Sequence, residues 1–110
     1  MAKVIMNEWT EQQINEMMQS NTPFCLYLYT PLCGTCQVAS KMLTVVKELT
    51  PNVTIGKCDL NYMPAKAKEW IVESVPCLLI FNDGIIDKRI YAFRSVEYLY
   101  TLIQESLIKE

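Results

Sequence analysis

Hydrophobic positions follow two different periods along this chain, and the two periods alternate. In four segments the apolar residues recur at the spacing of one helix face. Between these segments lie short runs that are apolar at nearly every position and have the length of strands. We expect the order helix, strand, helix, strand, helix, strand, strand, helix. This order is typical of an α/β fold with a central mixed β-sheet and helices on both faces.

Local signals define the ends of the first two helices. Thr10-Glu11-Gln12-Gln13 fits the capping-box pattern, so the first helix is expected from about Thr10 to Ser20. The second helix follows Cys33 and ends before Pro51, because proline disfavours helical geometry in the residue that precedes it. Its buried face is expected to consist of the apolar residues Val38, Met42, Val45, Val46 and Leu49.

The two later helices show the same spacing. Pro64 suits a first helical turn, because the N–H that proline lacks would have no partner there. This third helix is expected to bury Ala67, Trp70 and Ile71. The last helix is expected over residues 95–109, from Ser95 to Lys109. Its buried side is expected to consist of Val96, Leu99, Leu102, Ile103 and Leu107.

The sequence predicts strands at three places in the first half of the chain. Phe24–Tyr29 is apolar on both faces, which predicts a central strand covered by helices on both sides. Val53–Cys58 predicts a second buried strand, followed by a loop over Asp59–Met63. A further short strand is expected at Val4–Met6.

A hairpin is predicted in the second half. The strands Cys77–Phe81 and Ile85–Tyr91 flank Asn82-Asp83-Gly84, and glycine readily adopts the positive φ that tight turns require. The second of these strands carries Asp87, Lys88 and Arg89, so it is expected at an edge of the sheet.

Composition and charge restrict the class of protein. The 110 residues are too few for two ordinary cores, and about half are hydrophobic, so we expect one globular domain over residues 1–110. The net charge is -2, with no run of basic residues, which argues against nucleic acid as a partner. No apolar run reaches membrane-spanning length or resembles a signal peptide. We expect a cytoplasmic monomer with no membrane partner.

The chain contains no histidine, which removes Cys-His catalysis and most catalytic zinc sites. It has five cysteines, an odd number, and only one pair has a spacing with known chemistry. The disulfide framework of small secreted proteins is therefore a poor description. Any catalysis must use sulfur, carboxylates, lysine or tyrosine.

That pair is Cys33-Gly34-Thr35-Cys36, which lies where a buried strand gives way to an amphipathic helix. The free N–H groups and the dipole at a helix N-terminus stabilise a thiolate, so the pKa of Cys33 is expected below its usual value of about 8.5. Cys36 lies one turn later, where it can attack a mixed disulfide. The same spacing also occurs in zinc sites and by chance, so the pattern alone leaves redox, metal-binding and structural roles open.

The chain resembles the thioredoxin family from about residue 22 to its end. The resemblance is carried by the Cys33–Cys36 motif after a hydrophobic strand, by Lys57, by Val75-Pro76 some 40 positions later and by the hairpin at 82–84. It implies the thioredoxin fold and a redox-active Cys33–Cys36 disulfide with no further cofactor and no metal. It also implies disulfide-containing protein or low-molecular-weight thiol substrates, and a thioredoxin reductase as a further partner.

The resemblance assigns roles around the pair as well. In the family the proline that matches Pro76 is cis and lies against the disulfide, and the backbone of the residue matching Val75 pairs with the substrate. The alternative for Pro76 is a trans proline that starts a strand. Gly34 and Thr35 complete the motif. Lys57 is expected either to lower the pKa of the thiols or, alternatively, to extend into solvent from a strand end.

Several residues depart from the family pattern. Leu32 replaces a tryptophan, so the rim that faces the substrate is expected to be plainer. Thr35 replaces the common proline, and its hydroxyl is expected to raise the reduction potential. Tyr27 replaces a buried acid, and a phenol with a pKa near 10 is a poor base, so resolution by Cys36 is expected to be slower, with Asp59 as a substitute acid. Tyr91 replaces a glycine and is expected to narrow the substrate groove.

Three interpretations of function follow. The preferred one is a thiol–disulfide oxidoreductase in which Cys33 attacks and Cys36 resolves. The second is a metal-binding module in which Cys77, Cys58 or a partner chain joins the pair to hold zinc or an iron–sulfur cluster, although the chain has no second Cys-x-x-Cys. The third is a thioredoxin-fold binding module with little turnover. Cys25 and Cys58 are expected to be buried and inert. Cys77 is expected near the active-site surface, where a packing role is favoured over oxidation or metal coordination.

Overall fold

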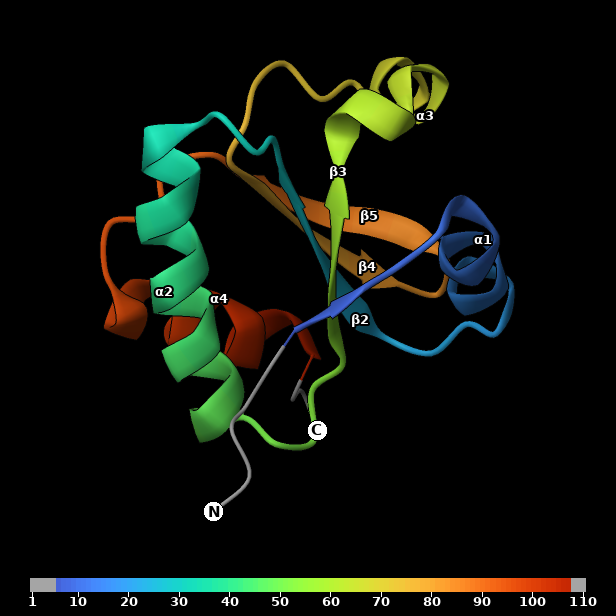
Figure 1. Cartoon of the computed structure of the whole chain (residues 1–110). Helices are drawn as coiled ribbons and strands as arrows, with labels where there is room; N and C mark the ends of the chain where they lie inside the picture. The colour runs from blue at the N-terminus through green and yellow to red at the C-terminus, as the bar shows by residue number, and fades with distance from the viewer. Residues whose placement is uncertain (1–5, 108–110) are drawn as a thin grey trace.

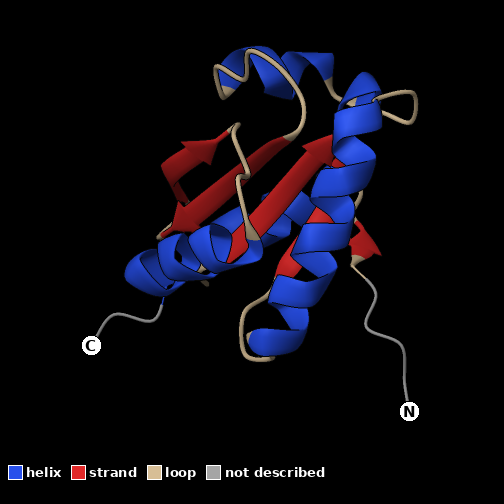
Figure 2. Cartoon of the chain, turned by 90° about the vertical axis from the view of Figure 1, so that its left-hand side faces the viewer, coloured by secondary structure: helices blue, strands red, loops and turns tan. Residues whose placement is uncertain are grey.

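The computed structural model describes residues 6–107, which form a mixed sheet between two pairs of helices (Figures 1 and 2). The strand order in this part of the chain is β1-β3-β2-β4-β5. The first three strands of that order are parallel, and β4 and β5 are antiparallel to their neighbours. The strands are β1 Asn7–Glu8, β2 Phe24–Tyr29, β3 Ile55–Asp59, β4 Cys77–Asn82 and β5 Ile85–Ile90. The predicted α/β class with a central mixed sheet is confirmed.

The helices cover both faces of this sheet. α2 and α4 pack on one face and α1 and α3 on the other, as Figure 1 shows. The helices are α1 Glu11–Gln19, α2 Gly34–Leu49, α3 Pro64–Glu69 and α4 Val96–Leu107, and a 3₁₀ helix, η1, spans Leu60–Tyr62. None of the helices in residues 6–107 is long and apolar enough to cross a membrane.

The central strand β2 connects the two cores. Its side chains alternate, so that Cys25 and Tyr27 face α2 and α4, whereas Phe24, Leu26 and Leu28 face α1 and α3. All five are buried. The prediction of a central strand covered on both sides is therefore confirmed. Because β2 is the middle strand, its end lies in the middle of the sheet edge from which α2 starts.

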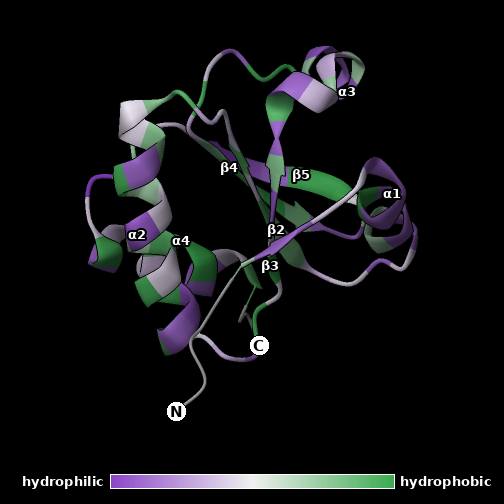
Figure 3. Cartoon of the chain, viewed as in Figure 1, coloured by the Kyte–Doolittle hydropathy of each residue, from purple (hydrophilic) through white to green (hydrophobic). Residues whose placement is uncertain are grey.

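Local signals act as predicted at two element ends. The Thr10 hydroxyl accepts from the N–H of Gln13 at 3.2 Å, and the Gln13 side chain accepts from the N–H of Thr10 at 2.8 Å, which completes the capping box. In the hairpin turn, Asp83 and Gly84 both have positive φ, 53° and 75°, and β5 lies at the sheet edge. Figure 3 colours most of α1 as hydrophilic, and Ile14 is its buried residue.

The buried face of α2 was predicted incorrectly. Val38, Val45 and Leu49 are 57%, 43% and 56% exposed, although Met42 packs against the core and Val46 is buried. Two apolar stripes run side by side along this helix. The sheet covers the stripe that contains Leu43 and Val46, and the stripe that contains Val38, Val45 and Leu49 stays exposed. The buried residues of α2 are Cys36, Ala39, Leu43 and Val46.

Three smaller predictions also need correction. Ile71 is 65% exposed with a φ of 57°, because α3 ends at Glu69 and the chain turns away after Trp70. The segment predicted as a loop after β3 contains η1. The first strand is Asn7–Glu8, and Met6 precedes it, while the predicted Val4 and Ile5 lie outside the described residues.

Candidate active site

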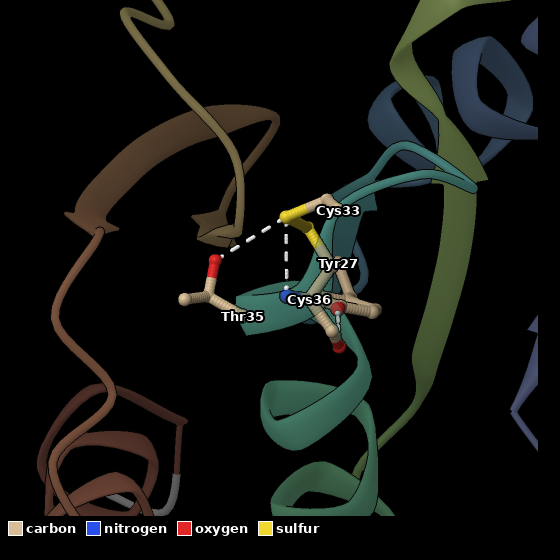
Figure 4. Close-up of a disulfide and its surroundings, with 4 residues drawn as sticks. All are labelled: Tyr27, Cys33, Thr35 and Cys36. Carbon is tan, nitrogen blue, oxygen red and sulfur yellow. Dashed lines mark hydrogen bonds between the residues drawn. A yellow bond between two sulfur atoms is a disulfide. The ribbon is translucent and has the colours of Figure 1, made fainter.

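Cys33 and Cys36 form a disulfide at the N-terminus of α2 (Figure 4), with their Cα atoms 5.1 Å apart. Cys33 is the N-cap residue and has extended backbone angles, and Cys36 lies in the first helical turn. Cys33 is half-buried, whereas Cys36 is only 3% exposed. The two cysteines therefore differ in access: Cys33 is partly exposed and Cys36 is covered.

Two donors surround the Cys33 sulfur. The N–H of Cys36 donates to Cys33 Sγ at 3.1 Å, and Thr35 Oγ1 lies 3.3 Å from the same atom (Figure 4). Donors at a helix N-terminus stabilise negative charge on an acceptor. The Thr35 hydroxyl thus lies beside the sulfurs, as the sequence predicted. A Cβ atom on Gly34 would meet no atom within 4 Å, so the backbone there is open to approach.

Tyr27 lies behind Cys36. Its hydroxyl donates to the Cys36 carbonyl at 2.6 Å, and burial raises its pKa to about 12. Its ring stacks on Tyr29 at 5.7 Å between centroids and meets the edge of Phe93 at 6.0 Å. A phenol held in this way keeps its proton at neutral pH, so Tyr27 is a structural contact to the motif and not a base.

A cavity of about 390 Å³ opens beside Cys36. Tyr27 and Tyr29 line it from β2, Lys57 from β3 and Lys41 from α2. The Lys57 ammonium lies 5.6 Å from the centre of the Tyr29 ring, and Lys57 is the register partner of Tyr27 in the parallel pair. Lys57 therefore borders the same cavity as Cys36.

Asp59 does not border that cavity. Its carboxylate accepts from the N–H of Asn61 at 2.9 Å and so caps η1. It lines a different cavity together with Glu8 and Cys58. The suggestion that Asp59 substitutes for the missing acid next to Cys36 therefore finds no support in the geometry.

The Val75-Pro76 bond is cis. Cys77, the next residue, is opposite Leu28 in the antiparallel pair of β4 and β2, so Pro76 stands beside the end of β2. The segment that leads into β4 runs beside the turn before α2 (Figures 1 and 4). Val75 and Thr30 together line a cavity of about 390 Å³ on the α3 side of this turn.

Leu32 and Tyr91 occupy different surroundings. Leu32 is 99% exposed next to Cys33. The Tyr91 hydroxyl accepts from the N–H of Glu73 at 3.2 Å and donates to the Ile71 carbonyl at 3.4 Å. Tyr91 thus fastens the segment that leads to Val75, a contact that the sequence analysis missed, because nothing in the local pattern links residues so far apart.

The other three cysteines are buried thiols. Burial raises the pKa of Cys25 and Cys77 to about 12 and that of Cys58 to about 11. Cys77 is 0% exposed, so the expectation that it lies near the active-site surface was wrong: its side chain points into the core between the sheet, α1 and α3. Within residues 6–107, no group of three or more His, Cys, Asp or Glu side chains could hold a metal ion.

Tyr29 and Lys41 border the site although neither was singled out as a site residue. Side chains two residues apart in a strand lie on the same face, so the position of Tyr29 next to Tyr27 could have been predicted from the sequence. Lys41 lies on the polar face of α2 and has no signal of its own.

Comparisons with known proteins agree with this architecture. The family model described as Thioredoxin matches residues 4–105. The thioredoxin-like protein YusE of Bacillus subtilis is 50% identical over 100 residues, which cover 91% of this chain and 92% of YusE. A thioredoxin of Chlamydia trachomatis is 32% identical over 73 residues, 66% of this chain and 72% of its own.

Solved structures share the fold. Mitochondrial thioredoxin 3 of Saccharomyces cerevisiae superposes with a TM-score of 0.79 at 24% identity, covering 91% of this chain and 94% of its own. A mutant thioredoxin of Halobacterium salinarum gives a TM-score of 0.80 at 22% identity, covering 93% of this chain and 89% of its own.

Proposed function

Because the chain belongs to the thioredoxin family and is therefore a thiol–disulfide oxidoreductase, we propose that Cys33 attacks the substrate and Cys36 completes the reaction. The observation that carries these roles is the asymmetry of the pair. Cys33 is accessible and its sulfur accepts from the Cys36 N–H, whereas Cys36 is covered. An attacking sulfur needs access and a stabilised thiolate, and a resolving sulfur needs only proximity to the first.

The reaction proceeds in two exchanges. The Cys33 thiolate attacks one sulfur of a substrate disulfide, a Cys33–substrate bond forms, and the other substrate sulfur leaves as a thiolate that takes up a proton. Cys36 then loses its proton and attacks Cys33 Sγ, which closes the Cys33–Cys36 disulfide and releases the second substrate thiol. The substrate gains two electrons, the pair loses two, and no other cofactor takes part.

Disulfide-containing proteins or low-molecular-weight disulfides would approach across exposed Leu32 and Gly34 and pair with the backbone at Val75 beside Pro76. Tyr91 would shape this side by holding the segment before Val75. Lys57 would act on the thiols from the cavity next to Cys36.

A thioredoxin reductase would return the oxidised pair to the dithiol. The protein would work in the cytoplasm as a single thioredoxin-like domain and a monomer, without membrane or nucleic-acid partners.

Serine variants test the two roles. Cys33→Ser is expected to abolish turnover of a protein disulfide such as insulin, and Cys36→Ser to accumulate mixed disulfides that mass spectrometry detects. Cys58→Ala is the control and is expected to keep full turnover, since its thiol is buried outside the site. Full turnover by Cys33→Ser would contradict the assignment.

A further inference from the structure

Resolution requires that Cys36 lose a proton, yet the groups around it do not accept one. The Tyr27 hydroxyl commits its own proton to the Cys36 carbonyl. The carboxylate of Glu8 accepts from the Tyr29 hydroxyl at 2.6 Å and from the N–H of Asp59 at 3.2 Å, and the Asp59 carboxylate caps η1. Both line the cavity on the far side of Tyr29, away from Cys36.

The cavity beside Cys36 is lined by lysines and by no carboxylate, unlike the cavity that Glu8 and Asp59 line. Its charged lining residues are Lys41 and Lys57, and in the described part of the chain no carboxylate lies within salt-bridge distance of either. Gln37 and Ser40 add polar groups. A volume of about 390 Å³ is sufficient for a small molecule. Two cations in a partly enclosed space raise the local concentration of anions.

We propose that this cavity binds a small basic oxyanion, a carboxylate or a phosphate, which accepts the proton of Cys36 during resolution. The proposal rests on the proposed function and deepens it. The proton passes from Cys36 Sγ to the oxyanion, the Cys36 thiolate attacks Cys33 Sγ, the bond between Cys33 and the substrate breaks, and the departing thiolate takes the proton back. The oxyanion is thus regenerated. It comes either from solution or from an acidic side chain of the substrate.

Stopped-flow reaction of the reduced protein with dithiodipyridine, a neutral disulfide with a coloured leaving group, separates the steps. The first equivalent of colour reports attack by Cys33 and the second reports resolution by Cys36. At constant pH and ionic strength in a sulfonate buffer, inorganic phosphate is expected to accelerate the second phase at least about tenfold and to saturate. Sulfate, similar in shape but a far weaker base, is expected to compete with phosphate without accelerating.

Two results would overturn the proposal while leaving the proposed function intact: a second phase that ignores phosphate, or one that sulfate accelerates equally. A missing first phase would instead refute the proposed function, so the two failures are distinguishable. Loss of the second phase in Glu8→Gln would identify an internal base and would also overturn the proposal.

Lysine variants test the location. Replacing Lys41 and Lys57 together by Gln is expected to raise the phosphate concentration for half-maximal acceleration by about five- to tenfold. Replacing Lys66 and Lys68 of α3 together by Gln removes the same number of charges away from the cavity; this matched control is expected to leave that concentration unchanged. An equal shift in the control would show a general charge effect and overturn the site.

A peptide pair identifies the source of the oxyanion. Two disulfide peptides are compared in phosphate-free buffer, one with Glu beside its cysteine and one with Gln at the same position. A faster resolution step with the Glu peptide would show that the substrate's carboxylate occupies the site. Equal rates, with the response to phosphate retained, would assign the site to a free anion.

Discussion

Thr35 places a hydroxyl 3.3 Å from the Cys33 sulfur, in the turn where the N–H of Cys36 also donates to it. The hydroxyl favours the thiolate over the protonated thiol, because a donor to a charged acceptor is stronger than one to a neutral acceptor. Thr35→Val keeps the shape and removes this donor. Alkylation of reduced protein by iodoacetamide at neutral pH is expected to become about three- to tenfold slower, since less Cys33 is ionised.

Thr44→Val is the matched control for this prediction. Thr44 lies in the same helix, and its hydroxyl donates to the Ser40 carbonyl at 3.0 Å, away from the sulfurs. The control is expected to alkylate at the original rate. Redox titration against glutathione provides the second measurement, and Thr35→Val is expected to be the more reducing protein, because its thiolate is less stabilised. An unchanged alkylation rate and potential would show that the Thr35 hydroxyl does not act on Cys33.

Tyr27 contributes a contact and not a proton. Tyr27→Phe leaves the Cys36 carbonyl without this donor in a buried place, so the free energy of unfolding is expected to fall by about 1–2 kcal/mol in urea titration. The pH dependence of the resolution step is expected to stay the same, because the phenol is protonated throughout the working range. A pH midpoint that moves in Tyr27→Phe would contradict this role.

At the scale of elements, α2 offers a matched pair of leucines. Leu43 is fully buried between α2 and the sheet, whereas Leu49 is 56% exposed. Leu43→Ala is expected to lower the free energy of unfolding by about 2–5 kcal/mol, because it removes buried methyl groups and leaves a cavity. Leu49→Ala is expected to change it by about 0.5 kcal/mol or less. Similar losses in the two variants would show that the Leu49 side of α2 is covered in solution.

The same helix shows where sequence reasoning stops. The capping box at Thr10 and the turn at Asp83-Gly84 were predictable, because each depends on contacts within a few residues. The buried face of α2 was not, since Val45 and Val46 both belong to apolar stripes and the neighbouring sheet decides which stripe is covered. Local pattern therefore located the elements better than it oriented them.

The candidate site divides in the same way. Cys33, Thr35 and Cys36 lie together because a single helix start positions them, so the sequence placed them correctly. Two contacts needed tertiary structure. The Tyr27 hydroxyl reaches the Cys36 carbonyl only after β2 and α2 pack, and the Tyr91 hydroxyl reaches the Glu73 N–H only after β5 joins the sheet.

At the scale of the whole molecule, the sheet separates two cores, and each holds a fully buried free thiol. Cys25 lies in the core under α2 and α4, and Cys77 lies in the core under α1 and α3. Burial raises the pKa of both well above the ordinary thiol value, to about 12, because neither core can solvate a thiolate. Both thiols therefore stay protonated in the folded chain at a pH where they ionise in the unfolded chain.

This difference lowers the free energy of unfolding at alkaline pH. At neutral pH both states keep the thiol protons. As pH rises past about 9 the unfolded chain loses them first, so the free energy of unfolding falls until pH reaches the folded value of about 12. Each thiol contributes about 1.4 kcal/mol per pH unit within this window.

Urea titrations with reductant at about pH 8 and about pH 10 test this dependence. Between these two pH values the free energy of unfolding of Cys25→Ala is expected to fall by less than that of the unaltered protein. Val46→Ala trims the same core without removing an ionisable group and is expected to retain the full alkaline loss, because the loss arises from the thiol proton and not from packing. Equal alkaline losses in the two variants would show that the Cys25 thiol does not carry the effect.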